Sequence, residues 1–437
     1  MTEEKNTCRL SGICGGCFYY DMSYEEQLQK KNDTVKGLLD GVVREEYLYE
    51  GIIRSPLAFA YRNKMEYSFG DERKNGPLTL GLHKKRSFYD VIDTDCCGLV
   101  HEDFNVIVRE TRRFFDDLGA TYKDKRTHRG FLRYLLIRRA VNTGEILVDL
   151  VTTSQPLIPV MAHALINDNV LYDEEALSRG EIRASSAVNT YDAADTVAQW
   201  AGQLVALQEK GEITGKLSGI LHTIDDAKAD AVKNEGTRIL YGTDSITEEL
   251  LGLKFRITPF SFFQTNSKGA EVLYEKVREY VNDSLSETST VYDLYSGTGT
   301  IAQMMAPKVK HVIGVEIVPE AVEAAKENAA GNGLSNCAFI AGDVLKVLDE
   351  IEEKPDVIIL DPPRDGIHPK ALPKILAYGV KTIIYVSCKC ESLARDLVPI
   401  QAAGYRLVKA CAVDQFPWTR SVETIALFKR NPESGEW

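Results

Sequence analysis

The stretch VYDLYSGTGT, residues 291–300, decides the fold predicted for this chain. A run of strand-forming residues passes at once into a turn with two glycines, as happens where a parallel strand leads into a helix. Four more apolar runs follow, separated by helical segments such as PEAVEAAKENAAGNG, and they are HVIGVEI, CAFIAG, DVIILD and TIIYVS. This alternation predicts an α/β fold with a doubly wound parallel sheet in the C-terminal part of the chain.

The glycine turn also predicts a cofactor site. Gly297 and Gly299 allow a ligand to approach the backbone, and Glu316 ends the next strand, where an acceptor for ribose hydroxyls is expected. Nicotinamide and S-adenosylmethionine sites share this plan, and with Ala302 the glycines also fit a loose G-x-G-x-x-A pattern. A turn that only packs is the third alternative, so this stretch leaves the ligand open.

Polar residues follow the later strands at the same edge of the sheet. Asp343 follows the third strand, DPPRDG (361–366) follows the fourth and Ser387-Cys388 follows the fifth. Because ligands of open α/β sheets bind beyond the carboxyl ends of the strands, these residues are expected to converge. Cys388 is then a candidate nucleophile, since a partly exposed thiol near charged groups can ionise. A buried core thiol, or a C-x-C ligand pair with Cys390, are the alternatives.

The composition is that of an ordinary globular protein. The chain has 437 residues, 44% of them hydrophobic, and a formal charge of −12, which is enough length for two or three domains. No apolar run approaches the roughly 20 residues that span a bilayer, and the start MTEEKNTCRL lacks the plan of a signal peptide. We therefore expect a cytoplasmic protein. Its acidic total argues against general nucleic-acid binding but permits a local basic surface.

Three cysteines lie close together near the start of the chain. Cys8, Cys14 and Cys17 have the spacing C-x5-C-x2-C, with glycines between the last two. In a reducing compartment this spacing favours a metal or cluster over disulfides. Three thiols need a fourth ligand, and zinc, an iron–sulfur cluster and unliganded thiols all remain open at this point.

The region from about 52 to 257 predicts a mixed α+β domain. Strands are expected in YRNKMEYSFG, LTLGLHKK, FLRYLLIRRA, EILVDLVTT and KLSGILHTI, and helix over much of 160–210. Ser23 and Glu26 form a capping-box signature before a helix. Basic and aromatic residues interleave here, which suits contacts with RNA phosphates and bases but also solvated strand faces. These residues are Tyr61–Lys64, His83–Tyr89, Lys125–Arg129, Arg133, Arg138 and Arg139.

Nearly the whole chain resembles the RNA uracil-5 methyltransferases that use S-adenosylmethionine. The resemblance rests on CRLSGICGGC, YRNKMEYSFG, FSFFQTN, DLYSGTGT, DPPRDG, VSCKCESLARDL and DQFPWTRSVETIALF. It implies that Cys388 is the nucleophile and Glu423 the general base, whereas a glutamate in a strand would otherwise be expected to face solvent. It implies that the methyl-donor site, or the space between donor and base, is lined by Gln264, Tyr295, Gly297, Gly299, Thr300, Glu316, Asp343 and Asp361. Phe262 would border the target base together with Asp361, with core packing as the alternative for Phe262.

The same resemblance implies a [4Fe-4S] cluster. Cys8, Cys14 and Cys17 would supply three ligands, and IDTDCCGLVHEDFN offers Cys96 and Cys97 for the fourth, of which Cys97 matches the family better. A structural or RNA-positioning role is expected, because methyl transfer moves no unpaired electrons. Zinc at the same residues is the alternative.

The implied chemistry explains why a thiol and a carboxylate are needed together. Carbon 5 of uracil is a poor nucleophile, and addition of a thiolate at carbon 6 turns it into an enolate-like centre that can attack a sulfonium methyl group. A base must then remove the carbon 5 proton before the thiolate can leave. The target nucleotide is expected to swing out of its stack into the site.

We therefore expect a class I methyltransferase domain over 258–437, preceded by an α+β RNA-binding region with a cysteine-ligated cluster over 1–257. The helix near 23–40 is expected to pack on the catalytic domain. The expected product is 5-methyluridine in 23S rRNA, made by a monomer. The alternatives are a tRNA uracil-5 methyltransferase, a non-catalytic RNA-binding or assembly protein, and an amino-group methyltransferase.

Two departures from the family bear on the choice of RNA. Many members begin with a small β-barrel RNA-binding module, and here only seven residues precede Cys8. Lys389-Cys390 stands after the nucleophile in place of the usual Asn-Pro. Together these departures leave open which RNA is modified, whereas the methyl-transfer residues are intact.

Overall fold

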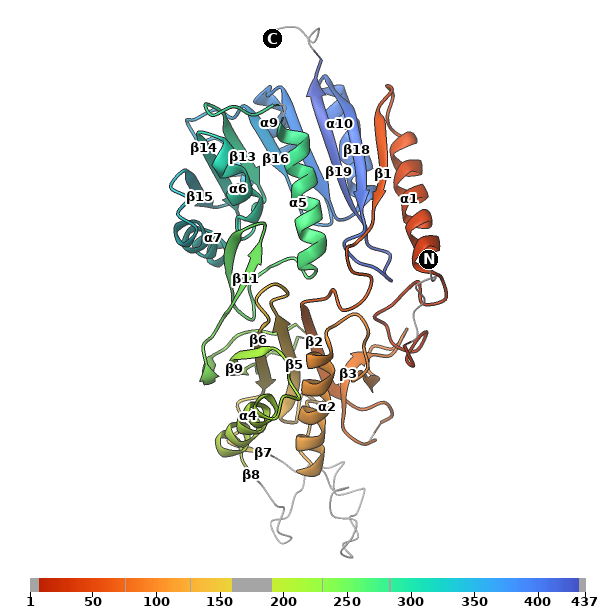
Figure 1. The fold of residues 1–437 in the computed structure, drawn as a ribbon, viewed down its shortest axis with the longest axis vertical. Coiled ribbons are helices and arrows are strands. Elements are labelled where there is room, and N and C mark those ends of the chain that lie inside the picture. The colour runs from red at the N-terminus through yellow and green to blue at the C-terminus, as the bar shows by residue number, and fades with distance from the viewer. Residues whose placement is uncertain are drawn as a thin grey trace, which may run out of the picture.

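Two large β-sheets organise the chain. The computed structural model describes residues 8–74, 76–125, 127–158, 191–229, 231–282 and 284–431. An eight-stranded sheet with helices on both faces lies above a seven-stranded sheet in Figure 1. Much of the segment 160–210, expected to be helical, lies outside the described residues, and its remainder forms α4 (Ala193–Glu209).

The eight-stranded sheet confirms the predicted α/β fold. Its strand order is β1-β18-β19-β17-β16-β13-β14-β15. The strands are β1 (Leu48–Ile53), β13 (Thr290–Leu294), β14 (His311–Glu316), β15 (Cys337–Ala341), β16 (Val357–Leu360), β17 (Thr382–Ser387), β18 (Tyr405–Val413) and β19 (Glu423–Arg430). The sheet is not wholly parallel, because β19 runs antiparallel between β17 and β18. That insertion brings the start of β19 to the edge where β17 ends.

Helices cover both faces of this sheet, so its central strands are apolar on both sides. In β17, Ile384 and Val386 join the core on one face, and Ile383 and Tyr385 join the core on the other. One face carries α5 (Ser267–Asn282), α6 (Thr300–Met305), the 3₁₀ turn Ala306–Lys308 and α7 (Pro319–Gly331). The other carries α1 (Tyr24–Asp40), α8 (Val344–Val347), α9 (Ala371–Ala377) and α10 (Cys390–Ala402).

Helix α1 begins at the predicted capping box. The Ser23 backbone N–H donates to Glu26 Oε2 at 2.7 Å, and the Glu26 N–H donates to Ser23 Oγ at 3.3 Å. The helix lies against β1 and α10, and β1 pairs in parallel with the edge strand β18. Residues 24–53 therefore build onto the sheet formed by the C-terminal part of the chain, and only afterwards does the chain enter the second sheet.

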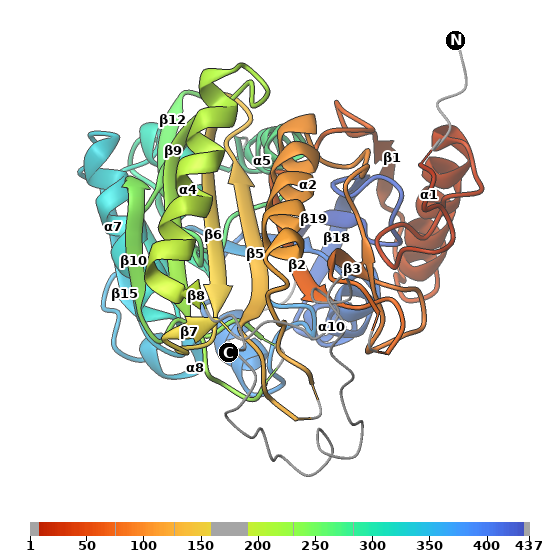
Figure 2. The ribbon, with the colours of Figure 1, turned by 90° about the horizontal axis from the view of Figure 1, so that it is seen from below.

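The seven-stranded sheet has the order β10-β9-β6-β5-β2-β3-β4. Its strands are β2 (Lys64–Gly70), β3 (Thr79–His83), β4 (Val91–Asp93), β5 (Leu132–Arg139), β6 (Glu145–Thr152), β9 (Lys216–Ile224) and β10 (Thr237–Gly242). Helices α2 (Glu102–Asp117) and α4 lie next to each other on one face (Figure 2). Two small pairs complete the fold, β7 (Leu157–Ile158) with β8 (Tyr191–Asp192) and β11 (Ile246–Leu250) with β12 (Leu253–Ile257). The five strands expected between 52 and 257 are all present.

None of the helices in the described ranges has both the length and the apolar character needed to cross a bilayer.

Candidate active site

The loop after β13 has the backbone form that a close ligand requires. Tyr295, Gly297 and Gly299 all have positive φ, at 68°, 54° and 72°. At Gly299 a Cβ would lie 2.5 Å from the Phe339 ring, so no larger residue fits. Tyr295 holds the same left-handed form despite its side chain, which signals a constrained backbone at this edge of the sheet.

Glu316 connects this loop to the end of β14. Its Oε2 accepts the Gly297 N–H at 3.0 Å, and its Oε1 accepts the Val318 N–H at 3.0 Å. The carboxylate is therefore fixed before any ligand arrives, and each oxygen keeps lone-pair capacity for a further donor. This geometry suits the ribose contact expected from the sequence.

The remaining residues expected near the methyl donor lie around the loop. Thr300 is buried at the start of α6, and the half-buried Gln264 side chain hydrogen-bonds Tyr274 of α5. Phe262 is 67% exposed, which rules out core packing, and its ring lies 3.7 Å from the position that a Cβ on Gly297 would take. An exposed aromatic ring over the glycine turn is available to a flat ligand.

Two aspartates end neighbouring strands, and they differ in character. Asp343 is exposed and caps α8, with Oδ1 accepting the Leu345 N–H at 2.9 Å. Asp361 follows β16, and burial raises the pKa of its carboxyl to about 7. One carboxylate oxygen of Asp343 is thus used to cap α8. The Asp361 carboxyl instead lies in surroundings that favour its protonated form, beside the thiol and carboxylate described next.

Cys388 and Glu423 meet at the edge where β17 ends. The last paired residues of β17 and β19 are Ser387 and Thr424, so Cys388 lies one step beyond the ladder on one strand and Glu423 one step beyond on the other. Cys388 is half-buried and Glu423 is 3% exposed. The antiparallel β19 therefore brings a thiol and a carboxyl group together from distant parts of the sequence.

The surroundings of this pair favour the protonated form of both groups in the free protein at neutral pH. Burial and then the Asp361 charge raise the pKa of Glu423 to about 8, and the Arg364 guanidinium opposes the rise. Burial, Glu423 and Asp361 raise the pKa of Cys388 to about 11, again opposed by Arg364. The expected activation of the thiol by nearby charge is therefore wrong for the free protein, because the neighbouring charges are mostly negative.

Three further residues near Cys388 and Glu423 were not identified as site residues from the sequence. Arg364 belongs to the DPPRDG motif, and its charge acts on both reactive groups. Asp293 of β13 is buried, its pKa is raised to about 8 by burial and then by Asp361, and its Oδ2 caps α6 through the Ala302 N–H at 2.9 Å. Burial raises the pKa of Tyr274, as do Asp361, Glu423 and Asp293. The motifs carried a signal for Arg364 and Asp293, but nothing in the sequence marks Tyr274.

The expected basic–aromatic residues divide into two groups. Arg133, Arg138 and Arg139 serve the fold: Arg133 pairs with Asp225 at 2.5 Å, Arg138 donates to the Pro259 carbonyl at 3.0 Å, and Arg139 donates to Asp103 at 3.0 Å. Tyr61 and Asn63 are buried as well. The prediction that Arg133, Arg138 and Arg139 contact RNA is therefore wrong, because their guanidinium groups bond to other parts of the protein.

A second group remains at the surface. Phe88 and Tyr89 are 63% and 58% exposed, and Lys125 Nζ lies 4.3 Å from the centre of the Phe88 ring. His83, the last residue of β3, stacks on Phe88 with ring centres 6.5 Å apart. Exposed rings beside cations are what unpaired bases and phosphates bind. Arg126, within the expected run, lies outside the described residues.

The cysteines form a separate site. Cys8, Cys14, Cys17 and Cys97 line one cavity of about 310 Å³ under β3, together with Phe59 and Arg62 among others. Cys96 does not line it, and its sulfur accepts the Arg9 Nε–H at 3.0 Å instead. Among the described residues, no three Cys, His, Asp or Glu side chains are arranged as a metal site. The four thiols predicted as ligands from the sequence therefore line one cavity, but their sulfur atoms are not arranged around a common point where a metal could bind.

The sheet order, the glycine turn and the polar groups beyond the strand ends define a class I methyltransferase. A family model described as tRNA (Uracil-5-)-methyltransferase matches residues 231–431. An uncharacterized RNA methyltransferase of Caldanaerobacter subterraneus subsp. tengcongensis is 44% identical over 98% of this chain and 86% of its own length. One from Clostridium acetobutylicum is 43% identical over 97% of this chain and 83% of its own. The chain belongs to the same family of RNA methyltransferases as these relatives, and its C-terminal part matches the uracil-5 model.

A solved structure shares the fold over both sheets. It is that of Pyrococcus abyssi tRNA (uracil-54, C5)-methyltransferase in complex with S-adenosyl-L-homocysteine, with a TM-score of 0.67 and 24% identity. The match covers 95% of this chain and 86% of that one. The likeness concerns the architecture.

Proposed function

We propose that the protein forms 5-methyluridine in RNA by transferring the methyl group of S-adenosylmethionine to carbon 5 of a uracil. The observation that carries this proposal is the position of Cys388 and Glu423 on facing strand ends. A nucleophile for carbon 6 and a base for the carbon 5 proton must both reach one pyrimidine ring, and a thiol beside a buried carboxyl group supplies both roles.

The proposed reaction balances without an oxidant. Cys388 loses its proton to solvent, its sulfur adds to carbon 6, and the electron pair moves to carbon 5. Carbon 5 then attacks the methyl group of the sulfonium, the sulfur–methyl bond breaks, and S-adenosylhomocysteine leaves. Glu423 removes the carbon 5 proton, the carbon–sulfur bond breaks, and the thiolate leaves with 5-methyluracil restored.

The raised pKa values fit an electrostatic switch within this reaction. In the free protein, burial raises the pKa of Asp361 to about 7. Burial and the Asp361 charge raise the pKa of Glu423 to about 8, and burial with both carboxylates raises the pKa of Cys388 to about 11. A cation brought into the site favours the charged form of each group. The sulfonium of the methyl donor is such a cation, so we propose that its binding promotes proton loss from this cluster.

The donor itself would lie over the glycine turn. We propose that Glu316 accepts hydrogen bonds from the ribose, with Gly297 and Gly299 allowing close approach, and that Tyr295, Thr300, Gln264 and Asp343 complete the site. Asp343 would use the oxygen that does not cap α8. Phe262 and Asp361 would face the target base.

We propose 23S rRNA as the substrate, with tRNA as the alternative that the matched family description favours. The test is incubation of the protein with labelled S-adenosylmethionine and unmodified 23S rRNA or tRNA, followed by nucleoside identification. Labelled 5-methyluridine in 23S rRNA is the expected result. Label in tRNA alone would show that the substrate is tRNA and not 23S rRNA. Label on an exocyclic amine would refute uracil-C5 chemistry, and no label would favour a non-catalytic RNA-binding protein.

We further propose that Cys8, Cys14, Cys17 and Cys97 hold a [4Fe-4S] cluster. Four thiols lining one cavity fit the ligand set of such a cluster, and Cys97 rather than Cys96 faces that cavity. When bound, the cluster would join residues 8–17 to residue 97. The methyl-transfer steps make no use of it.

A further inference from the structure

The position of Glu423 is set by its backbone. Within the described chain no side chain hydrogen-bonds its carboxylate, although the group is 3% exposed. On one side Glu423 enters β19, where it pairs with Val413. On the other side it follows the turn 414–421, which joins β18 to β19. Contacts that fix the turn 414–421 therefore also fix the position of the Glu423 carboxylate.

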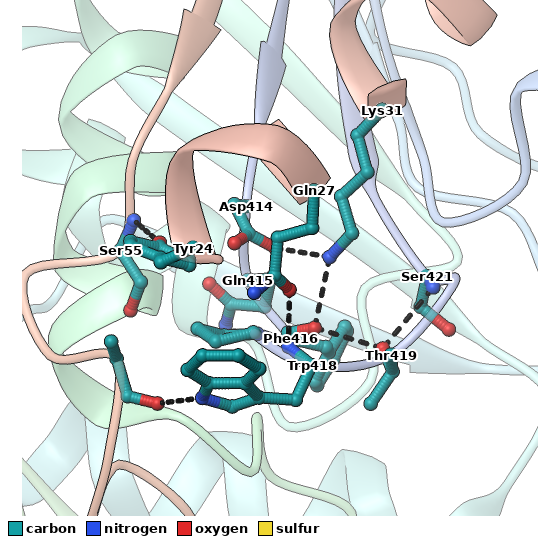
Figure 3. Close-up of polar contacts among 12 residues, drawn as sticks. Tyr24, Gln27, Lys31, Ser55, Asp414, Gln415, Phe416, Trp418, Thr419 and Ser421 are labelled. Carbon is teal, nitrogen blue, oxygen red and sulfur yellow. Dashed lines mark hydrogen bonds and ion pairs between the residues drawn. The ribbon is translucent and has the colours of Figure 1, made fainter. Parts of the chain in front are cut away.

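Helix α1 holds the turn from one side (Figure 3). Lys31 Nζ donates to Asp414 Oδ1 at 2.6 Å and to the Phe416 carbonyl at 3.0 Å. Gln27 Oε1 accepts the Trp418 backbone N–H at 2.7 Å. Gln27 and Lys31 are one helical turn apart, so both side chains reach the turn from the same face of α1.

Trp418 is the most constrained residue of the turn. Its φ is +67°, a conformation that bulky residues rarely adopt, and its side chain is fully buried. The indole Nε1–H donates to the Ala58 carbonyl at 2.7 Å, and the ring stacks on Phe59 with centres 4.9 Å apart. Such a backbone persists only where its surroundings over-determine it.

The same residue binds the segment that follows the cysteines. The Trp418 carbonyl accepts the Phe18 N–H at 2.8 Å and the Tyr19 N–H at 3.1 Å. Phe59, on which the indole stacks, also lines the cysteine cavity. Trp418 therefore touches α1, the segment after Cys17 and the wall of the cysteine cavity at once.

We propose that Gln27 and Trp418 are positioning residues for the elimination step: by fixing the turn 414–421 they hold Glu423 over carbon 5 of the substrate. The proposal rests on the base role proposed for Glu423. It predicts a selective defect, because nucleophilic attack and methyl transfer use Cys388 on a different strand, whereas only proton removal needs Glu423 in place.

The test compares Gln27→Met with Gln29→Met. Gln27 is buried and bonded to Trp418, whereas Gln29 lies on the same helix, exposed and bonded to Asp33. Two substrates separate the steps. RNA with 5-fluorouridine at the target permits attack and methyl transfer but no proton removal, so it traps the adduct, and ordinary RNA requires elimination.

Gln27→Met should trap fluorinated RNA at the rate of Gln29→Met, while turnover of ordinary RNA falls roughly tenfold to a hundredfold, as expected for a displaced catalytic group. A methyl-labelled adduct should accumulate on ordinary RNA. Equal turnover in the two variants, or an equal fall with both RNAs, would overturn the proposal. Trp418→Phe loses the indole N–H bond to Ala58 and part of the buried ring, but its backbone can still bond to Gln27, Phe18 and Tyr19. It should show the same split and provides a second variant if Gln27→Met does not fold.

The proposed function fails independently of this inference. If the unsubstituted protein makes no 5-methyluridine, or Glu423→Gln shows no elimination block, the base assignment is lost. If both behave as proposed and Gln27→Met eliminates normally, only the positioning role is lost.

Discussion

The Lys31 ammonium lies 2.6 Å from the Asp414 carboxylate, although 383 residues separate the two in the chain. Their side chains are 1% and 0% exposed, so this is a buried ion pair between the first helix and the turn before Glu423. Burial lowers the pKa of Lys31, and the Asp414 charge opposes that change. The pair thus ties residues near the start of the chain to the catalytic edge of the sheet.

Lys31→Met should destabilise the protein strongly. It leaves Asp414 buried without a counter-ion, which typically costs about 3–5 kcal/mol of unfolding free energy. Lys36→Met is the control, because Lys36 forms an exposed pair with Asp40 on the same helix and such pairs contribute about 0–1 kcal/mol. Urea unfolding measures both. The double substitution Lys31→Met with Asp414→Leu should recover stability, and a harmless Lys31→Met would contradict the buried pair.

Cys388→Ala and Glu423→Gln should fail at different steps. Cys388→Ala should give neither 5-methyluridine nor an adduct, since no bond to carbon 6 can form. Glu423→Gln should attack and methylate but not eliminate, leaving a methyl-labelled protein–RNA adduct on denaturing gels. Cys337→Ala is a matched control, because that thiol is also half-buried with a pKa raised to about 11 but lies on β15. Normal methylation by Cys388→Ala would refute the nucleophile.

The rate should depend on pH through the carboxylates beside the thiol. Glu423 must be ionised to remove the carbon 5 proton, and its pKa is raised to about 8. Because the ionised form is the active one, kcat should rise as pH increases from 6 through about 8. Arg364→Met removes the positive charge that lowers this pKa, so its profile should move to higher pH. A profile that is flat, or that moves to lower pH in Arg364→Met, would contradict this electrostatic account.

Adjacent cysteines should differ in their effect on iron content. Cys97 lines the cavity with Cys8, Cys14 and Cys17, whereas the Cys96 sulfur is bonded to Arg9. Protein purified without oxygen should contain about four irons, and Cys97→Ser should lose them while Cys96→Ser keeps them. Iron and sulfide analysis measures this. Zinc without iron, or loss of iron from Cys96→Ser alone, would overturn the assignment.

Local patterns in the sequence were sufficient for the elements. Apolar runs with glycine or proline at their ends predict β13 to β17, and Ser23 with Glu26 predicts the start of α1, because such signals act over a few residues. The same reasoning failed for Arg133 and Arg138. A strand arginine at the surface and one buried against carbonyls look alike in sequence, because only the packing of other segments decides its exposure.

The sequence by itself determined which chemical groups this protein carries: a glycine turn before an acidic strand end, a thiol after an apolar strand, a late glutamate, and cysteines at positions 8, 14, 17, 96 and 97. Only the tertiary structure decided how they meet. The antiparallel β19 places Glu423 opposite Cys388, and α1 returns to the turn before β19 to hold it. Strand order and long-range contacts arise from the burial of both faces of the sheet as a whole, which no local pattern encodes. The protonation states follow from that same burial.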